Sequence, residues 1–281
     1  MIKNFIELKE RLQQQGQKGR IAAVCVKDEA TREALQLAEE AGIAEAIFVD
    51  DDEPAEAAAR AVAMIRRGEA DVLMKGLIGT DQLLRAVLNK ETGILRRTEQ
   101  AGAVLTHMTL TEIPAHHKML LFTDAAVIPY PTQEQRIEQV RYMAEVCHAL
   151  SIDEPRIALL HCAEHGGKAF PFVDAYADII RMAADGAFGR CIVDGPLDLK
   201  TACSVEALRT KGLSSPLEGE TDGLILPDIE AGNVLYKALT FFANAKTAGM
   251  LCGTTAPVIL PSRGDSTEVK FNSILFALSA R

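Results

Sequence analysis

Short apolar runs rich in β-branched residues alternate with amphipathic helical stretches along most of this chain. In the first part, strand-like runs occupy Ile21–Val26, Ala46–Val49 and Val72–Met74, with helical periods between them. A strand, a covering helix and a second parallel strand form a βαβ unit, in which the strands are buried on both faces. This alternation predicts an α/β fold whose mostly parallel sheet lies between layers of helices.

The helices of the first part can be bounded from the same pattern. They are predicted at Ile2–Gln15, Glu29–Ala41, Glu53–Arg67 and from Asp81 onward, with Thr80 as the N-cap of the last. Two further strand-like runs, Ala103–Thr111 and Lys118–Phe122, are separated only by Glu112–His117. So short a connection cannot cross over a sheet, and we expect this pair to be antiparallel.

A second α/β series follows a predicted helix at Thr132–Leu150. The segment SIDEP, residues 151–155, has the composition of a linker. Beyond it the pattern predicts strand Arg156–Leu160, helix Pro171–Ala184, strand Cys191–Val193, helix Leu199–Leu208, strand Gly223–Leu226 and helix Glu230–Ala248. We therefore expect two α/β domains that meet near residue 150, with a ligand cleft between them.

Composition argues against several classes of function. The chain has 30 basic and 39 acidic residues, and its formal net charge of −9 repels nucleic-acid phosphates. No apolar run is long enough to span a bilayer, and the first residues lack a signal-peptide pattern. Six scattered cysteines without a C-x-x-C pair are typical of free thiols in a reducing compartment. We expect a cytoplasmic protein without nucleic-acid or membrane partners.

One stretch imitates a metal site. His161–His165, HCAEH, matches a zinc-peptidase pattern whose two histidines must share one face of a helix. Here the stretch directly follows a predicted strand and runs into Gly166–Gly167, so we expect a polar loop and no metal.

Residues suited to anion binding follow several of the predicted strands. After Val72–Met74 come Lys75, Gly76, Thr80 and Arg85, where a glycine-containing loop leads into a helix. Free N–H groups at a helix start, with cations nearby, favour phosphate, although an ordinary strand-to-helix turn has the same composition. Other polar or turn-forming residues at strand-to-helix junctions are candidates for the same ligand: Asp124, Pro129, Asp194, Gly195, Pro196, Asp228, Gly232 and Asn233.

The segment PSRGDS near the end of the chain carries the strongest signal. Ser262 and Arg263 directly follow a strand, and Gly264 lets a ligand approach the backbone. Arginine binds phosphate with two parallel hydrogen bonds, and a serine hydroxyl can donate to an anion or to sulfur. Asp265 or Ser266 can cap the final helix, and Asp265 could instead accept a proton.

The segments DGPLDL, LILPDIEAGNVLYKAL and PVILPSRGDS, in this order and spacing, resemble the phosphate acyltransferase family of phosphotransacetylases and phosphotransbutyrylases. KGLIGTDQLLRAVLNKETGIL and LLFTDAAVIPYPTQEQ extend the likeness, which covers about residues 70–281 and looks closest to the phosphotransbutyrylases. Five stretches in a fixed order are a specific signal.

This resemblance implies a reaction and an architecture. The reaction converts acyl-CoA and phosphate to acyl phosphate and CoA by direct transfer in a ternary complex, with a short or branched acyl chain such as butyryl or isobutyryl. The fold implied is a two-domain, three-layer αβα arrangement with mixed, mostly parallel sheets, similar to isocitrate and isopropylmalate dehydrogenases. Residues 1–150 with 253–281 then form the first domain and residues 151–252 the second. A homodimer or higher homo-oligomer is implied, with no metal and no cofactor beyond the substrates CoA and inorganic phosphate.

The resemblance also assigns roles. Arg263 is expected to hold phosphate and the developing oxyanion, Ser262 to orient the CoA sulfur, and Arg85 to bind CoA. Phosphotransacetylases carry a proposed catalytic aspartate seven residues beyond the serine, where this chain has Val269. Asp265 and Glu268 are the nearby carboxylates that could replace it, and the sequence does not choose between them.

Two other functions are compatible with this architecture. One is a metal- and NAD-dependent 2-hydroxy acid dehydrogenase of related fold, and the other is a non-catalytic acyl-CoA-binding protein. Both lack the phosphate-dependent release of CoA that an acyltransferase would show.

Overall fold

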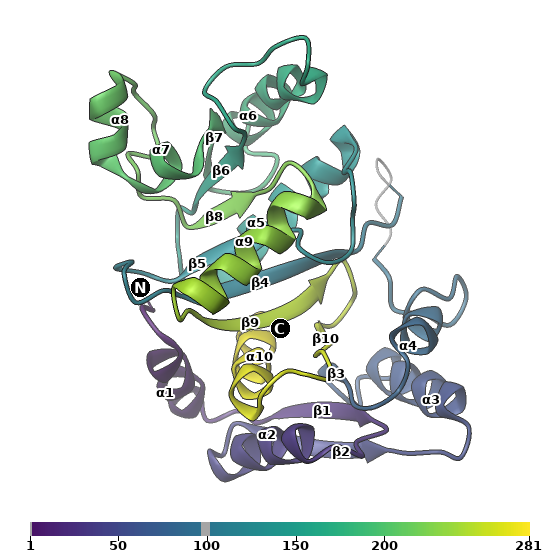
Figure 1. Cartoon of the computed structure of the whole chain (residues 1–281). Helices are drawn as coiled ribbons and strands as arrows, with labels where there is room; N and C mark the ends of the chain where they lie inside the picture. The colour runs from purple at the N-terminus through teal and green to yellow at the C-terminus, as the bar shows by residue number, and fades with distance from the viewer. Residues whose placement is uncertain (1, 97–101) are drawn as a thin grey trace. The chain divides into compact units, whose positions relative to one another are not determined.

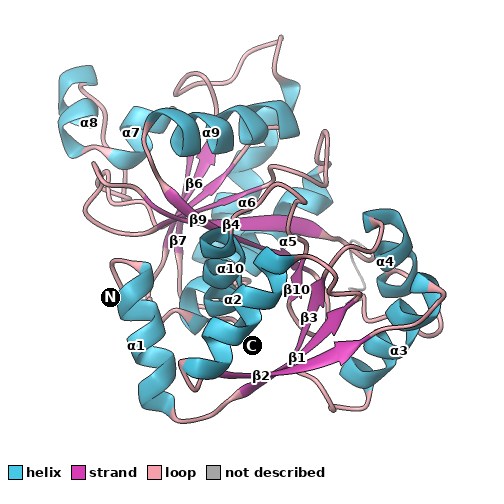
Figure 2. Cartoon of the chain, turned by 60° about the horizontal axis from the view of Figure 1, so that its bottom comes forward, coloured by secondary structure: helices cyan, strands magenta, loops and turns pink. Residues whose placement is uncertain are grey.

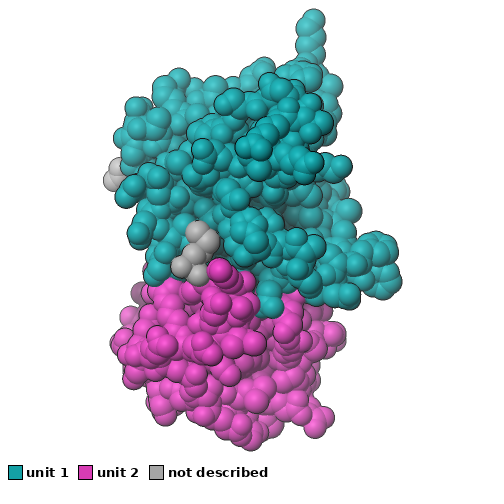
Figure 3. Space-filling view, turned by 90° about the vertical axis from the view of Figure 1, so that its left-hand side faces the viewer, with its two compact units in different colours: residues 1, 106–245 teal, residues 2–105, 246–281 magenta. Residues whose placement is uncertain are grey.

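The structure is a computed structural model that describes residues 2–96 and 102–281, in which helices and strands alternate along the chain (Figures 1 and 2). It divides into two compact units, drawn in different colours in Figure 3. Unit 1 comprises Thr106–Ala245, and unit 2 comprises Ile2–Leu105 together with Lys246–Arg281. Unit 2 is therefore built from both ends of the chain.

The sheet of unit 2 has the strand order β2-β1-β3-β10-β9. These strands are β1 (Gly19–Val24), β2 (Ala44–Val49), β3 (Val72–Lys75), β9 (Lys246–Cys252) and β10 (Val258–Ile259). The pairs β2–β1, β1–β3 and β3–β10 are parallel, whereas β9 runs antiparallel to β10. The mixed, mostly parallel sheet that the sequence predicts is confirmed in this unit.

Helices cover both faces of this sheet. They are α1 (Phe5–Gln15), α2 (Glu29–Glu40), α3 (Pro54–Arg66), α4 (Thr80–Val87) and α10 (Thr267–Ser279). Figure 2 shows α2 and α10 on one side of β1 and β3, and α3 and α4 on the other. Helix α10 packs against α1, α2 and β9, so its residues 272–278 are buried all round. A helix surrounded in this way needs apolar residues on every face, as FNSILFAL provides.

Unit 1 has the strand order β4-β5-β8-β6-β7. These strands are β4 (Thr106–Glu112), β5 (Leu120–Thr123), β6 (Arg156–Leu160), β7 (Ile192–Leu197) and β8 (Gly223–Ile225). The pair β4–β5 is antiparallel, as its short connection predicts, and β5–β8, β8–β6 and β6–β7 are parallel.

The helices of unit 1 also lie on two faces of their strands. They are α5 (Gln133–Ala149), a 3-10 helix at Pro171–Ala175, α6 (Tyr176–Ala184), α7 (Leu199–Cys203), α8 (Val205–Lys211) and α9 (Ile229–Phe242). Leu224 of β8 packs in a core that includes Leu235 and Leu239 of α9. The neighbouring Gly223 instead faces Met143 of α5, because successive residues of a strand point to opposite faces.

The division into units differs from the expected boundary at residue 150. Residues 106–150 belong with the later strands, because β5 pairs with β8 and α5 packs against β5, β6 and β8. The second expected boundary, at residue 252, falls instead between Ala245 and Lys246. The terminal strand and helix, β10 and α10, belong to the same unit as the N-terminal strands.

Several predicted element bounds are wrong in an instructive way. The helix predicted over Glu230–Ala248 ends at Phe242, and Asn244, with φ 51°, lies in the left-handed region before β9 begins. Ser204 adopts an extended backbone and divides the helix predicted at Leu199–Leu208 into α7 and α8. Apolar periodicity alone cannot register such local changes of backbone conformation.

Among the described residues, no helix combines the length and apolar character needed to cross a membrane.

Candidate active site

The candidate site of unit 2 lies where three neighbouring parallel strands end. Strands β1, β3 and β10 are adjacent and parallel, so their carboxyl ends share one edge, where ligands of open α/β sheets bind. Lys75 is the last residue of β3, Asp28 lies between β1 and α2, and Arg263 lies between β10 and α10. We call this place the carboxyl-terminal edge of unit 2.

The loop between β10 and α10 is held by its own side chains. The Asp265 carboxylate accepts a hydrogen bond from the backbone N–H of Ser262 at 2.7 Å, and the Ser262 hydroxyl accepts one from the N–H of Gly264 at 3.4 Å. Ser266 is the N-cap of α10, since its hydroxyl accepts from the N–H of Val269 at 3.3 Å. The two alternatives for the cap are thereby resolved: Ser266 caps the helix and Asp265 shapes the loop.

Arg263 presents its guanidinium to solvent at the start of α10. Within residues 2–96 and 102–281 it has no ion pair and no side-chain hydrogen bond, and it is exposed. The predicted site residue Glu268 is also exposed, but it is paired with Lys246 at 3.2 Å. An unpaired guanidinium beside the positive end of a helix dipole is suited to a doubly charged anion.

Lys75 is buried at the same edge, with only 4 % of its surface exposed. Its ammonium donates to the carbonyl of the adjacent Gly76 at 3.3 Å, the one hydrogen bond of this side chain within the described part of the chain. Burial lowers the pKa of Lys75, and the positive charges of Arg263 and Lys270 lower it further. Asp28 and Asp265 oppose this effect without reversing it.

A buried ion pair beside Lys75 was not foreseen from the sequence. Lys270 of α10, 2 % exposed, donates to the Asp28 carboxylate at 2.6 Å and to the Thr31 hydroxyl at 2.9 Å. Burial would raise the pKa of Asp28, but the hydrogen bonds from Lys270 and Thr31 outweigh it and the pKa is lowered. The sequence did contain a signal for this ion pair: Lys270 lies inside the apolar stretch EVKFNSILF, and a buried lysine needs a charged partner.

The remaining predicted residues of this segment have local explanations. A Cβ on Gly76 would lie 2.4 Å from the carbonyl oxygen of Cys25, so glycine is needed where the chain leaves β3. Thr80 was predicted to cap α4, but the helix begins at Thr80 and Gly79 is the N-cap, whose N–H donates to the Gln82 side chain at 3.3 Å. Arg85 is exposed on α4 and lies 3.6 Å from Asp81.

Asp124 in unit 1 organises the bend after β5. Its carboxylate is 3 % exposed and accepts from the backbone N–H groups of residues 126, 127 and 128 at 2.7, 2.9 and 3.2 Å. It also accepts from the Thr106 hydroxyl at 2.8 Å and the His107 N–H at 3.1 Å. The bend continues to Pro129, whose carbonyl accepts from the first residue of α9 at 2.9 Å.

The other predicted residues of unit 1 also support its backbone. Asp228 caps α9 by accepting from the Ala231 N–H at 2.8 Å, and a Cβ on Gly232 would meet the Asp124 carbonyl oxygen at 2.0 Å. Asn233 is exposed on α9. Asp194, Gly195 and Pro196 lie within β7, not at the predicted strand-to-helix junction, and Asp194 accepts from the Ser215 hydroxyl at 2.6 Å.

The HCAEH stretch is not a helix. Residues 161–167 form bends and irregular backbone, so the two histidines do not share a helical face. Within the ranges that the structure describes, no group of three histidine, cysteine, aspartate or glutamate side chains is arranged to hold a metal ion.

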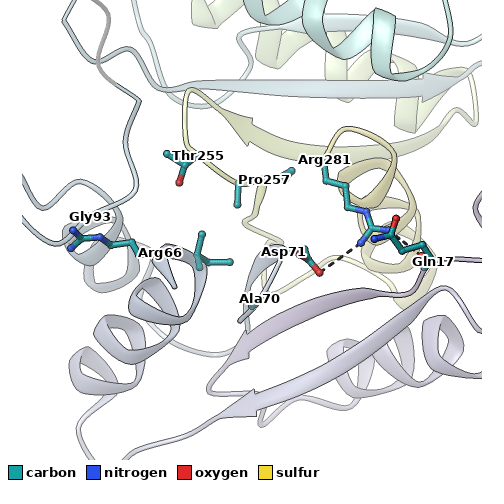
Figure 4. A pocket seen from close by; sticks show the side chains of 10 residues that line it. Gln17, Arg66, Ala70, Asp71, Gly93, Thr255, Pro257 and Arg281 are labelled. Atoms are coloured by element: carbon teal, nitrogen blue, oxygen red, sulfur yellow. Dashed lines mark hydrogen bonds and ion pairs between the residues drawn. The ribbon is translucent and has the colours of Figure 1, made fainter. Parts of the chain in front are cut away.

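A hollow of about 660 Å³ lies at the opposite end of β3 and β10. Its lining includes Ala70, Asp71 and Pro257, which precede these strands, and the ion pair of Asp71 with Arg281 at 3.7 Å (Figure 4). Ligands of open α/β sheets bind at the carboxyl ends of strands, so this hollow is separate from the candidate site.

Comparison with known proteins decides the family. A family profile described as "Phosphate acetyl/butaryl transferase" matches residues 14–278. The chain belongs to this family. It is 36 % identical over 300 residues to a phosphate butyryltransferase of Clostridium beijerinckii, which covers 99 % of this chain and 97 % of that protein.

Solved structures agree with this phosphate acetyl/butyryl transferase assignment. The crystal structure of a branched-chain phosphotransacylase from Enterococcus faecalis V583 has a TM-score of 0.84 and 32 % identity, covering 93 % of this chain and 98 % of that one. A phosphotransacetylase from Streptococcus pyogenes, at 19 % identity, has a TM-score of 0.82 over 98 % of both chains and so shows the shared fold.

The structure brings together those predicted site residues that belong to the carboxyl-terminal edge of unit 2. At the carboxyl-terminal edge of unit 2, the charges of Arg263 and Asp265 both act on Lys75. Asp28 and Lys270, which the sequence analysis did not select, belong to the same cluster. In unit 1 the start of α9 lies against the bend after β5, since its first residue donates to the Pro129 carbonyl and a Cβ on Gly232 would meet the Asp124 carbonyl oxygen. The carboxylates of Asp124, Asp194 and Asp228 are, however, each engaged with backbone N–H groups or a local hydroxyl.

Proposed function

We propose that this protein is a phosphate acyltransferase that converts acyl-CoA and inorganic phosphate to acyl phosphate and CoA. The preferred acyl group is short or branched, such as butyryl or isobutyryl. The proposal draws on the phosphate butyryltransferase name of a relative that matches nearly the whole chain. The branched-chain phosphotransacylase title of the Enterococcus faecalis structure points the same way. These likenesses favour acyl transfer over the dehydrogenase alternative.

One observation carries the proposal: two cations without an anionic partner share the carboxyl-terminal edge of unit 2. Arg263 is exposed and unpaired among the described residues, and Lys75 is buried with one long hydrogen bond to a carbonyl. Two such cations next to a helix N-terminus repel each other and gain most from a ligand with two negative charges. Inorganic phosphate has that charge near neutral pH.

The reaction needs alignment and charge stabilisation from these groups. Arg263 holds the phosphate, whose oxygen attacks the thioester carbonyl, and the same guanidinium stabilises the oxyanion that develops on the carbonyl oxygen. Fixed donors of this kind lower the barrier because they are already oriented before the charge appears. Ser262 is assigned to the CoA sulfur and Arg85 to CoA, as the family resemblance implies.

Direct transfer between the two substrates fits the chemistry of the cysteines. Burial raises the pKa of Cys25, Cys147 and Cys191, and it raises the pKa of Cys203 to about 11. A thiol of raised pKa is a poor nucleophile near neutral pH. We therefore assign none of these four thiols as an acyl-accepting nucleophile. The protein is expected to act in the cytoplasm as a homodimer or larger homo-oligomer, with CoA and phosphate as its small-molecule substrates.

The test is CoA release from acetyl-, butyryl-, isobutyryl- and isovaleryl-CoA, with and without phosphate. Released CoA is followed with a thiol reagent, and a blank without substrate corrects for the exposed Cys162. We expect release only with phosphate and fastest with the four- or five-carbon chains. Release that ignores phosphate would indicate a thioesterase, and CoA binding without release would indicate the non-catalytic alternative.

A further inference from the structure

The proposed reaction moves a proton as well as an acyl group. In the direction of acyl phosphate, a phosphate hydroxyl loses its proton as its oxygen bonds to the carbonyl carbon. The C–S bond then breaks, and the CoA sulfur must gain a proton to leave as a thiol. A group that accepts the first proton and donates it to sulfur would serve both directions of the reaction.

The carboxylates of the carboxyl-terminal edge are already engaged. Asp265 accepts from the Ser262 N–H at 2.7 Å and so fixes the loop that carries Arg263. Glu268 is turned to Lys246 at 3.2 Å on an exposed surface. Asp28 accepts from Lys270 and from Thr31, and these bonds keep its pKa low. A carboxylate held in its ionised form in this way is a poor proton carrier.

Lys75 has the opposite character. It ends the middle one of three adjacent parallel strands, so it lies between the segments that follow β1 and β10. An ammonium has three N–H donors, and this buried one donates to a single carbonyl at 3.3 Å. A buried ammonium with donors to spare loses its proton more readily than one in water.

We propose that Lys75 is the proton-transfer residue of this enzyme, a role that rests on the proposed acyltransferase function. Arg263 holds the phosphate, and the fraction of Lys75 that is in the neutral amine form takes the proton of the phosphate hydroxyl as the new C–O bond forms. The resulting ammonium gives that proton to the CoA sulfur as the C–S bond breaks, which restores the neutral amine. In the reverse direction the amine takes the thiol proton and returns it to the leaving phosphate oxygen.

Four charged groups surround Lys75 and set how easily it releases its proton. Arg263 and Lys270 disfavour the ammonium, and Asp28 and Asp265 favour it. Asp28 and Lys270 belong to one ion pair, yet they act on Lys75 with opposite sign. This opposition separates a proton-transfer role from a structural one, because breaking a merely structural ion pair from either side should have the same consequence.

The first experiment compares Lys75→Arg with Lys75→Met. Arginine keeps the positive charge but does not release its proton, and methionine removes both properties. We expect both variants to lose about 100-fold or more in kcat, the scale of a general acid–base group. Lys75→Arg should keep a KM for phosphate within a few-fold of wild type. Thermal unfolding by circular dichroism checks that both variants are folded.

Rescue by added amines distinguishes proton transfer from a structural role, because an added amine would not restore a structural contact. Small primary amines should restore activity to a Lys75→Ala variant, more strongly for amines whose pKa lies near that of the thiol. If Lys75→Arg retains near-wild-type kcat, Lys75 only binds phosphate and the proposal is overturned. If the wild type itself lacks phosphate-dependent CoA release, the acyltransferase function fails, and the proposal fails with it. The two failures are therefore distinguishable.

The second experiment measures kcat against pH for Asp28→Asn and Lys270→Met. It uses the direction of acyl-CoA formation at saturating acyl phosphate and CoA. The acidic limb, the fall of kcat at low pH as the amine becomes protonated, then reports on the ternary complex. Asp28→Asn removes a charge that favours the ammonium, and the limb should move to lower pH. Lys270→Met removes a charge that disfavours it, and the limb should move to higher pH. Glu33→Gln is the control, because Glu33 accepts from Thr267 of α10 at 2.8 Å and is not among the groups that shift the pKa of Lys75. Shifts in the same direction, or none, would overturn the proposal.

Discussion

Replacing Arg263 by alanine should abolish most of the activity without weakening the fold. The side chain is exposed and makes no hydrogen bond or ion pair within residues 2–96 and 102–281. No internal contact is lost when it is removed, so the free energy of unfolding should change by less than about 0.5 kcal/mol. Function should change far more, because this guanidinium, unpaired within the described residues, lies in the loop that leads into the N-terminus of α10.

The magnitude follows from what one fixed donor contributes to a transition state. Loss of a single oxyanion donor typically costs about 3–4 kcal/mol, which is about 100- to 1,000-fold in kcat. Arg263 is assigned to both the phosphate and the oxyanion, so the loss should reach at least the lower figure and the KM for phosphate should rise as well. Arg263→Lys keeps a point charge but not the two-pronged geometry, and should fall between the wild type and alanine.

The assay measures phosphate-dependent CoA release from butyryl-CoA across a range of phosphate concentrations. Arg66→Ala is the matched control, since Arg66 is exposed in the same unit and lines the hollow at the other end of the strands. The control should retain the wild-type kcat. A kcat of Arg263→Ala within a few-fold of wild type would refute the placement of phosphate. So would a loss of activity that is fully explained by a loss of folded protein.

Three further outcomes follow from the local structure. Gly76→Ala should be strongly destabilising in urea unfolding, because its Cβ would lie 2.4 Å from a backbone oxygen, and an unchanged midpoint would contradict this close packing. Ser266→Ala should lower the free energy of unfolding by roughly 1 kcal/mol because the cap of α10 is lost, and Ser266→Gly should lower it by only a few tenths of a kcal/mol. A larger loss for glycine than for alanine in the same assay would contradict this assignment of the cap. The pKa of Asp198 is lowered to about 2, because hydrogen bonds from Lys211 and Thr201 outweigh its burial. Its contribution to stability is therefore complete above pH 3.8 and is lost as the pH falls towards 2. Asp198→Asn should flatten this acidic part of the stability curve, and an unaltered curve would contradict the assignment.

The helices and strands were largely predictable, and the exceptions share one cause. Periodicity identified β1, β3 and α2 to within a few residues because their apolar stripes are regular. It merged the end of α9 with β9, since Asn244 changes the backbone direction without interrupting the apolar pattern. A single residue with left-handed backbone dihedral angles can end a helix, and hydrophobic periodicity does not reveal it.

The candidate site was predictable in part for a related reason. The rule that ligands bind after parallel strands selected Lys75, Arg85, Ser262 and Arg263, and the family resemblance then assigned roles to the last three. The sequence could not show that the Asp265 carboxylate accepts a hydrogen bond from its own loop, or that the Asp124 carboxylate accepts from backbone N–H groups. Whether a polar side chain faces a ligand or its own backbone depends on its neighbours in space.

The sequence alone therefore determined the α/β class and the family, and it supplied the residues that we propose for anion binding, because these depend on local pattern and side-chain type. Tertiary structure decided which of those residues share a neighbourhood. Lys270 and Asp28 are 242 residues apart in the chain, yet their side-chain atoms lie 2.6 Å apart beside Lys75. The strand order β1-β3-β10 brings them together, and that order is set by packing between distant segments that no local pattern encodes.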